Sequence, residues 1–271
     1  MAVFIHPQAI VHPKAQLGQD VNIGPFCVIE ERVEIGDRCH LEPYVQLKNF
    51  VRMGADNHIH SYVFLGAAPQ HMGYKGEETW VILGERNTVR EFATIHRSMP
   101  GEHGATTVGS DCMLMAYVHV AHDCRLGNHV IMANAASLAG HVEVGDHAVI
   151  SGMTGIHQFV RIGEYAFIGA MGGFVQDVPP YMLATGVRGR LYGPNRIGLK
   201  RAGITLDARR DLISAYKIIF RSGLTQEEGL VQVEAEISAT AEVRNLCRFI
   251  RESKRGITPA SSSDDENGVE M

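Results

Sequence analysis

Apolar residues recur at every sixth position over residues 5–65, 83–95 and 108–174. An amphipathic helix repeats every 3.6 residues and a strand every 2, so neither explains a period of six. A six-residue unit fits a short strand and a turn, and three units close a triangular coil of about 18 residues. The 26 hexads therefore predict a parallel β-helix of about nine coils.

Two other hexad positions support this interpretation. Glycine follows the apolar lead residue in eleven hexads, as at Gly18, Gly36 and Gly145, where we expect either an unusual φ angle or a close backbone approach. The fifth position of the hexad holds small residues. Four of the five cysteines occupy it: Cys27, Cys39, Cys112 and Cys124. We therefore interpret them as buried packing residues rather than zinc ligands.

Two insertions interrupt the repeat, at about residues 66–82 and 97–107. Loops that project from a rigid scaffold commonly carry functional groups, although a tolerated surface insertion is the alternative. After residue 174 the pair Pro179-Pro180 predicts the end of the coils, because proline has no N–H for a strand ladder.

The last quarter of the chain has a helical period. Residues 207–220 predict an amphipathic helix, and Thr225 with Glu228 predicts a capping box for the next helix. The final residues are polar and acidic, which is typical of disorder. We expect a β-helix over 1–190, an α-helical domain over 191–256 and a disordered acidic tail over 257–271.

Composition narrows the classes of protein. A net charge of −5 argues against a general nucleic-acid surface. No apolar run reaches the length of about 18 residues that a transmembrane helix needs, and the first residues do not resemble a signal peptide. The absence of a signal peptide points to a reducing compartment, so we expect a cytoplasmic protein without stable membrane insertion. The five cysteines contain no CxxC pair, which argues against a zinc cluster.

Histidines gather at one place in the repeat. The hexads that begin at 120, 138 and 156 stack on one face and contain His122, His141 and His157. His119 lies at the adjoining corner, and we expect His96 to extend the column. Three stacked histidines predict a functional site, either a base for catalysis or a set of metal ligands.

The neighbours of these histidines favour acid–base chemistry. Asp123 follows His122 and is able to fix its tautomer, while the backbone N–H of Gly140 is placed to face an oxyanion. No Ser or Cys stands out as a nucleophile, which favours direct transfer. A zinc enzyme like the γ-class carbonic anhydrases and a non-catalytic β-helical scaffold are the alternatives from other classes.

Six motifs together resemble one family. They are YVHVAHDC at 117–124, LAGHVEVGD, GMTGIHQF, QDVPPY, TIHR and GLKRAG. They are similar to the bacterial UDP-N-acetylglucosamine O-acyltransferases, the first enzymes of lipid A synthesis, over about residues 3–256. The resemblance implies a left-handed β-helix, with a homotrimer and clefts between neighbouring subunits. It also implies transfer of a 3-hydroxyacyl chain from acyl carrier protein to the sugar 3-position, without a metal or other cofactor. The phosphopantetheine of acyl carrier protein belongs to the co-substrate.

The resemblance also implies roles for individual residues. His122 corresponds to the general base, Asp123 to the residue that orients it, and Gly140 to the oxyanion donor. Ala170 corresponds to the position that sets acyl-chain length. The residues implied in substrate binding are Gln70, His96, His119, His141, His157, Gln158, Asn195 and Arg201.

The remaining expectations concern the two substrates. A basic patch is expected for the acidic acyl carrier protein, with the candidates Arg161, Arg209, Arg210, Lys217 and Arg221. Four positions depart from the family pattern: His71, Gly73, Ile197 and Ala202. All four fall where acceptor contacts are expected, so the acceptor is left open between a 3-hydroxyl and a 3-amino sugar.

Overall fold

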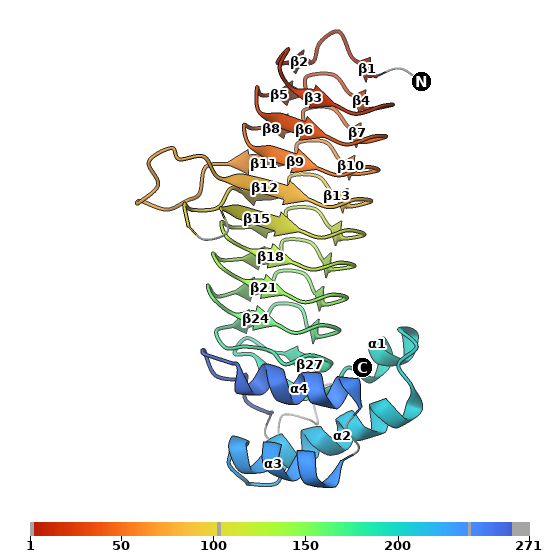
Figure 1. The fold of residues 1–271 in the computed structure, drawn as a ribbon, viewed down its shortest axis with the longest axis vertical. Helices are drawn as coiled ribbons and strands as arrows, with labels where there is room; N and C mark the ends of the chain where they lie inside the picture. Colours follow the sequence, from red (N-terminus) through yellow and green to blue (C-terminus); the bar gives the residue numbers. More distant parts are fainter. Residues whose placement is uncertain (1–2, 102–103, 238–239, 262–271) are drawn as a thin grey trace.

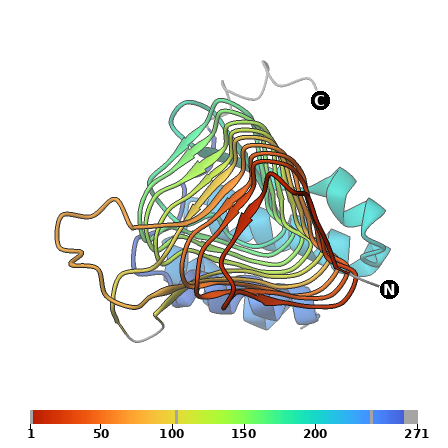
Figure 2. The ribbon, with the colours of Figure 1, turned by 90° about the horizontal axis from the view of Figure 1, so that it is seen from above.

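The fold is known from a computed structural model that describes residues 3–101, 104–237 and 240–261. Twenty-six short strands, β1 to β26, form a triangular prism, and four helices cover its C-terminal end (Figures 1 and 2). Each of these strands contains one lead residue of the hexad pattern. The predicted β-helix is confirmed, and its coils wind left-handed.

The strands form three sheets, one on each face of the prism. Sheet A contains β1 (Phe4–Ile5), β4 (Asn22–Ile23), β7 (His40–Leu41), β10 (His58–Ile59), β13 (Thr88–Val89), β16 (Met113–Leu114), β19 (Ile131–Met132), β22 (Val149–Ile150), β25 (Phe167–Ile168), β27 (Met182–Thr185) and β28 (Arg190–Pro194). Sheet B contains β2 (Ile10–Val11), β5 (Val28–Ile29), β8 (Gln46–Leu47), β11 (Phe64–Ala67), β14 (Thr94–His96), β17 (His119–Val120), β20 (Ser137–Leu138), β23 (Gly155–Ile156) and β26 (Gly173–Phe174). Sheet C contains β3 (Gln16–Leu17), β6 (Val33–Ile35), β9 (Val51–Met53), β12 (Trp80–Leu83), β15 (Ala105–Val108), β18 (Arg125–Leu126), β21 (Glu143–Val144) and β24 (Arg161–Ile162).

The lead and fifth-position residues fill the interior of the prism. Leu47, Ile95 and Leu138 are fully buried, and so are the fifth-position residues Cys27 and Cys124. Burial raises the pKa of the Cys124 thiol to about 12. The cysteines are therefore packing residues, as their place in the hexad predicted.

The turns explain the hexad glycines. Gly36 does not have a positive φ angle, but a Cβ there would lie 2.5 Å from the carbonyl carbon of Gly54 in the next coil. The left-handed conformation falls two residues later, on non-glycine residues such as Arg38 (φ 54°). Close backbone approach is therefore the expectation that holds at Gly36, whereas Gly66, at the start of the first insertion, has the positive φ angle (83°) that was the other expectation.

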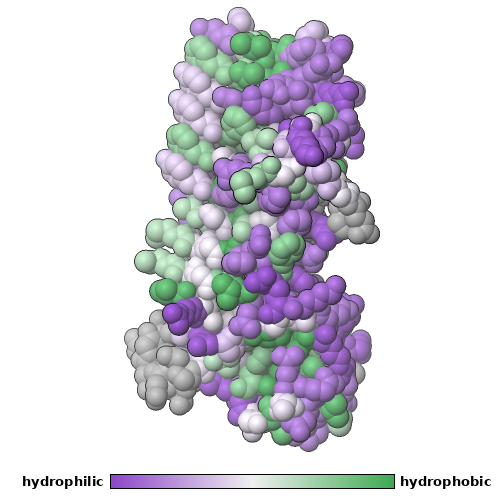
Figure 3. All heavy atoms as spheres, turned by 90° about the vertical axis from the view of Figure 1, so that its left-hand side faces the viewer, coloured by the Kyte–Doolittle hydropathy of each residue, from purple (hydrophilic) through white to green (hydrophobic). Residues whose placement is uncertain are grey.

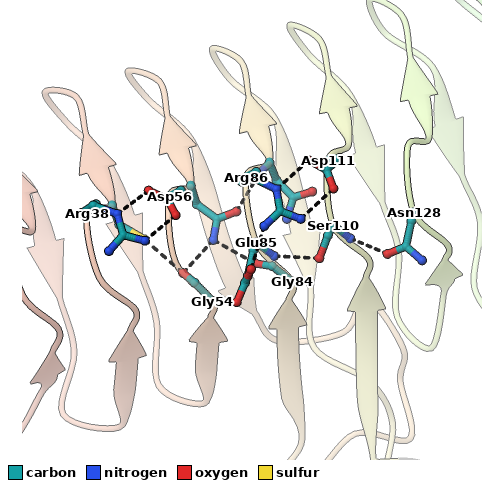
Figure 4. Close-up of polar contacts among 12 residues, drawn as sticks. Arg38, Gly54, Asp56, Gly84, Glu85, Arg86, Ser110, Asp111 and Asn128 are labelled. Carbon is teal, nitrogen blue, oxygen red and sulfur yellow. Dashed lines mark hydrogen bonds and ion pairs between the residues drawn. The ribbon is translucent and has the colours of Figure 1, made fainter.

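The corner between sheets C and A is here called the ladder corner. It stacks Arg38, Asp56, Arg86 and Asp111 at equivalent positions of successive coils (Figure 4). Arg38 donates to Asp56 over 2.7 and 2.6 Å, and Arg86 donates to Asp111 over 2.8 and 2.9 Å. Alternating charges thus link one coil to the next along this edge.

The corner between sheets B and C, here called the insertion corner, carries both insertions. The first leaves the prism after β11 and returns at Trp80, and the second leaves after His96 and returns at Ala105. The strands therefore reach further into both segments than the hexad frame predicted. In Figure 1 the longer insertion projects from one side of the prism.

The prediction that Pro179-Pro180 ends the coils is wrong. Val178 bridges Ile162 in parallel, and β27 then pairs in parallel with β25. The two prolines occupy the turn between these pairings, where no ladder N–H is needed. The antiparallel strand β28 closes sheet A, so sheet structure crosses the expected boundary at residue 190.

Four helices follow: α1 (Arg196–Arg201), α2 (Leu206–Arg221), α3 (Gln226–Glu236) and α4 (Ala241–Arg251). The capping box of Thr225 and Glu228 is present. The expected tail begins too early, because Ile257 bridges Asp177 and Ala260 bridges Leu191. The segment that contains Ile257 and Ala260 packs against the end of the β-helix because its polar residues are interspersed with residues that have apolar or hydroxyl side chains. Residues 262–271 lie outside the described part of the chain.

No helix in the described residues is long and apolar enough to cross a membrane.

Candidate active site

His122 and Asp123 lie in the insertion corner, between β17 and β18. The Nδ1 atom of His122 lies 2.7 Å from Oδ2 of Asp123, and both side chains are largely buried, at 11% and 16% exposure. Asp123 has a φ angle of 62°, the left-handed conformation that recurs at this turn position throughout the β-helix. Since an ionised carboxylate only accepts hydrogen bonds, this contact places the proton on Nδ1 and leaves Nε2 as the basic nitrogen.

Both insertions converge on this pair. The backbone N–H of Met99, in the second insertion, donates to Oδ2 of Asp123 over 3.1 Å. The ring of His71, in the first insertion, packs edge-on against the ring of His122 at a centroid distance of 5.6 Å. Thr106 accepts a hydrogen bond from the backbone N–H of Asp123 over 2.9 Å. The interpretation of the insertions as functional loops is thus favoured over that of tolerated surface insertions.

Gly140 lies directly beneath His122 in the next coil. A Cβ at this position would lie 2.6 Å from Cε1 of His122, so only glycine leaves room for the imidazole. Among the described residues, the Gly140 N–H has no hydrogen-bond acceptor. It is therefore available to an oxyanion close to the base.

The stacked histidines occupy different turn positions. His141 lies beneath Asp123, with its Nε2 atom 3.6 Å from Oδ2 of that carboxylate and its ring stacked on Phe159 at 4.5 Å. Burial lowers the pKa of His141, although the charge of Asp123 opposes this shift. The carboxylate is therefore shared between two imidazoles, and His141 is held in a fixed position beside the base.

Two further histidines lie beside the groove, of which His96 is buried and His119 half-buried. The rings of His96 and His119 meet edge-on at 4.8 Å, and Nδ1 of His119 lies 2.8 Å from Oγ1 of Thr94. Burial, with the neighbouring histidine charges, lowers the pKa of His96 to about 4. Burial and the charge of His122 also lower the pKa of His119. Both are therefore expected to be uncharged at neutral pH.

A groove of about 890 Å³ begins at His122 and follows sheet B toward the C-terminal end. Gln70 and His157 line it, and so do His119 and residues of the β27–β28 turn. Its lining is mostly apolar, with glycines at the strands β23 and β26. On the face that carries the insertions, apolar and hydrophilic patches lie side by side (Figure 3). The groove thus has the basic nitrogen of His122 at one end and a mostly apolar lining along its length.

Comparison with known proteins identifies the family. Residues 177–258 match the family model described as domain 2 of UDP N-acetylglucosamine O-acyltransferase, and residues 105–140 match the bacterial transferase hexapeptide model. An acyl-[acyl-carrier-protein]–UDP-N-acetylglucosamine O-acyltransferase from Thermodesulfovibrio yellowstonii is 46% identical over 93% of this chain and 98% of its own. One from Halorhodospira halophila is 47% identical over the same shares. The chain belongs to the UDP-N-acetylglucosamine O-acyltransferase family.

Solved structures agree. The family member from Bacteroides fragilis has a TM-score of 0.92 and 38% identity, covering 94% of this chain and 99% of that one. The member from Acinetobacter baumannii has a TM-score of 0.91 and 39% identity, over the same shares. The protein is therefore an acyltransferase, and the alternative of a γ-class carbonic anhydrase is not favoured.

One chain does not bring every residue implied by the family together. Asn195 and Arg201 belong to the region of α1, on the side of the prism opposite the long insertion (Figures 1 and 2). Asn195 caps that helix and donates to the carbonyl of Tyr165 over 3.0 Å. Ala170 is exposed in the turn between sheets A and B, and Gln158 is exposed beside His157. None of the four lines the groove.

The basic candidates do not form one patch. Arg161 lies over the ring of Phe249 at 4.4 Å, whereas Arg209, Arg210 and Lys217 lie on α2. The guanidinium of Arg221 donates to the carbonyl and hydroxyl oxygens of Ser261. Arg221 therefore anchors the C-terminal segment, and its assignment to a docking patch is not supported.

Sequence reasoning missed three contributors to this site: His71, Met99 and Thr106. His71 drew notice only as a departure from the family pattern, and no pattern indicated that it touches His122. The other two act through a backbone N–H and a hydroxyl oxygen, which carry no motif. Their only signal was their position in, or at the edge of, an insertion beside the histidine column.

Proposed function

We propose that this enzyme transfers a 3-hydroxyacyl chain from acyl carrier protein to the 3-position of UDP-N-acetylglucosamine or its 3-amino analogue, as the first step of lipid A synthesis. The observation that carries the proposal is the 2.7 Å contact between Nδ1 of His122 and Asp123 at the head of the apolar groove. A base held in this way suits deprotonation of a hydroxyl or amine nucleophile.

The chemistry follows from three groups. Nε2 of His122 takes the proton from the sugar nucleophile as that atom attacks the thioester carbonyl. The Gly140 N–H stabilises the resulting oxyanion. The tetrahedral intermediate then collapses, the carbon–sulfur bond breaks, and the His122 imidazolium returns its proton to the phosphopantetheine thiolate. Asp123 holds the imidazole in the tautomer that both proton transfers need, while His96, His119, His141 and His157 shape the cleft.

We infer a homotrimer with sites between subunits. Asn195 and Arg201 lie at α1, and Ala170 lies in the turn between sheets A and B, so none of them lines the groove at His122. They would reach a site through a neighbouring copy. A stack of exposed rings also follows the corner between sheets A and B, with neighbouring centroids 4.8 to 5.0 Å apart. Its members are Phe26, Tyr44, Tyr62, Phe92 and Tyr117. A long exposed apolar edge of this kind is typical of a subunit interface.

Further parts of the proposal concern partners and location. Within the trimer, Gln70 and Gln158 would contact donor and acceptor, Asn195 and Arg201 the nucleotide, and Ala170 the end of the acyl chain. Arg161, Arg209, Arg210 and Lys217 remain candidates for docking acyl carrier protein. We place the enzyme in the cytoplasm, in keeping with its free cysteines, and propose that transfer needs no metal.

The test is acyl transfer by the wild type and His122→Ala. The donor is 3-hydroxyacyl–acyl carrier protein, offered with each of the two sugar nucleotides, with and without a chelator. His129→Ala is the matched control, because His129 stacks on His147 at 4.5 Å in the ladder corner, away from the groove. We expect transfer that resists the chelator, falls about 10²–10⁴-fold in His122→Ala and is unchanged in His129→Ala.

The preferred acceptor then decides between an ester and an amide product. Failure to transfer to either sugar would refute the substrate assignment. Loss of activity with the chelator would instead favour a metal on His122, Asp123 and His141, whose ligand atoms lie within 4.8 Å of one another.

A further inference from the structure

A second cluster of histidines lies away from the groove, on sheet A and the turn that follows it. Strands β7 and β10 pair in parallel, with His58 opposite His40 and Ile59 opposite Leu41. His58 and His60 flank the buried Ile59, so both rings point outward. Glu42 occupies the same turn position as His60, one coil earlier. Two adjacent coils therefore present three metal-ligating side chains on one surface.

The ligand atoms of this cluster converge on one point. Oε1 of Glu42 lies 3.1 Å from Nε2 of His58 and 3.0 Å from Nδ1 of His60. All three atoms lie within 4.8 Å of one another. Zinc binds nitrogen and oxygen at about 2.0–2.2 Å in a tetrahedron, which places its ligand atoms about 3.3 Å apart. Two separations are already close to this value. The rings of His58 and His60 stack with centroids 4.1 Å apart, so rotation of a ring would direct both nitrogens at one ion.

The carboxylate is fixed by a neighbour. The second oxygen of Glu42 accepts hydrogen bonds from the backbone N–H of Ser61 over 3.2 Å and from its hydroxyl over 3.1 Å. Support of this kind orients metal-binding carboxylates. Arg90 is paired with Glu91 over 2.9 and 3.0 Å, and Oε1 of Glu91 lies 3.8 Å from Nδ1 of His60.

In a single chain the side chains of His58 and Glu42 are 42% and 27% exposed. Glu42 and His60 lie at the corner between sheets A and B, beside the stacked rings that we assign to the subunit interface.

We propose that Glu42, His58 and His60 form a binding site for a zinc-class divalent cation, separate from the acyl-transfer site. Two imidazoles and one carboxylate prefer such ions over Mg²⁺ or Ca²⁺, which favour oxygen ligands. The three ligands leave one tetrahedral position open to water. The ion would link the coil of β7 to the coil of β10.

The test is a Co²⁺ titration of the full chain, stripped of metals, with visible absorption as the readout. It is made in the His122→Ala background, which breaks the only other group of possible ligands found in the described residues. We expect one Co²⁺ per chain with an intense tetrahedral spectrum. Glu42→Gln and His60→Ala should each abolish that spectrum, Ser61→Ala should weaken binding roughly tenfold, and the control His129→Ala should leave it unchanged.

A thermal measurement separates lost ligands from lost folding. Zn²⁺ should raise the Tm of the His122→Ala chain and leave that of His122→Ala/Glu42→Gln unchanged, while the two chains have similar Tm values without metal. Absence of Co²⁺ binding at micromolar concentration, or the same spectrum in Glu42→Gln as in its parent, would overturn the proposal. Neither result bears on acyl transfer, which depends on other residues.

Discussion

The insertion corner and the ladder corner are built on the same backbone but treat their polar groups differently. Asp111 and Arg86 in the ladder corner have φ angles of 58° and 54°, and Asp123 and His141 in the insertion corner have 62° and 61°. At the ladder corner each charge meets its opposite in the next coil (Figure 4). At the insertion corner one carboxylate serves His122, His141 and a loop N–H.

The difference lies in register. In the ladder corner, functional groups repeat at the same turn position, so their contacts close within the stack. In the insertion corner, His122 faces Gly140 and Asp123 faces His141, because the histidine moves by one position between coils. That shift creates a space beside the imidazole instead of another contact. A regular scaffold thus becomes an active site through a break in its own repeat.

The largest expected effect comes from Asp123→Asn. An amide does not hold the His122 imidazole in the basic tautomer as a carboxylate does, so we expect kcat to fall about 10²–10⁴-fold. Asparagine tolerates a positive φ angle, so the fold should persist. Steady-state transfer assays measure the effect, and Asp111→Asn makes the same change at the ladder corner. Equal activities of the two variants would remove the orienting role of Asp123.

Gly140→Ala should follow in size. Its Cβ would lie 2.6 Å from Cε1 of His122 and displace the ring. A displacement on the order of 1 Å costs about 10²-fold in rate. The measurement is kcat for Gly140→Ala alone and in the His122→Ala background, where the substitution should have no further effect. Additive losses in the double variant would show that Gly140 acts independently of the base.

A glycine of the ladder corner, Gly36, should affect stability instead. A Cβ on Gly36 would lie 2.5 Å from backbone atoms of Gly54, which are unable to move without shifting the coil. Overpacking of this kind costs about 1–3 kcal/mol. Urea unfolding of Gly36→Ala should show that loss, while the activity of the folded fraction stays at the wild-type value. A loss of activity at full stability would erase the distinction between the corners.

Much of the difference between the insertion corner and the ladder corner was predictable from the sequence. The six-residue period placed the strands, the buried lead residues and the cysteines, because each hexad repeats one local structure. The adjacency of His122 and Asp123 and the stacking of their hexads also indicated the centre of the site. Periodicity is informative wherever the backbone repeats, since a residue's place in the hexad fixes its environment.

The errors fall where the repeat ends. The contacts of His71 and Met99 depend on how two aperiodic loops fold back, which no hexad position specifies. Pro179 and Pro180 signalled a stop, but they occupy a turn that needs no ladder N–H, so β27 continues sheet A. The acidic composition of the last residues hid the packing of Ile257 against the final coil. Tertiary contacts decided each of these cases.

The smallest effects are expected from the ladder itself, and they sharpen what its charges do. The guanidinium of Arg86 lowers the pKa of Asp111, but the two side chains are 51% and 30% exposed, so water and salt screen their attraction. Asp111→Asn should therefore lower Tm slightly at low ionic strength and not measurably at high ionic strength. Asp111→Arg places like charges in adjacent coils and should lower Tm further, again with a dependence on salt. If both variants matched the wild type at low ionic strength, the alternating charges would contribute nothing to coil stacking. The packed glycine turns and neutral hydrogen bonds, such as that from the Ser110 N–H to Asn128, would then hold this corner together.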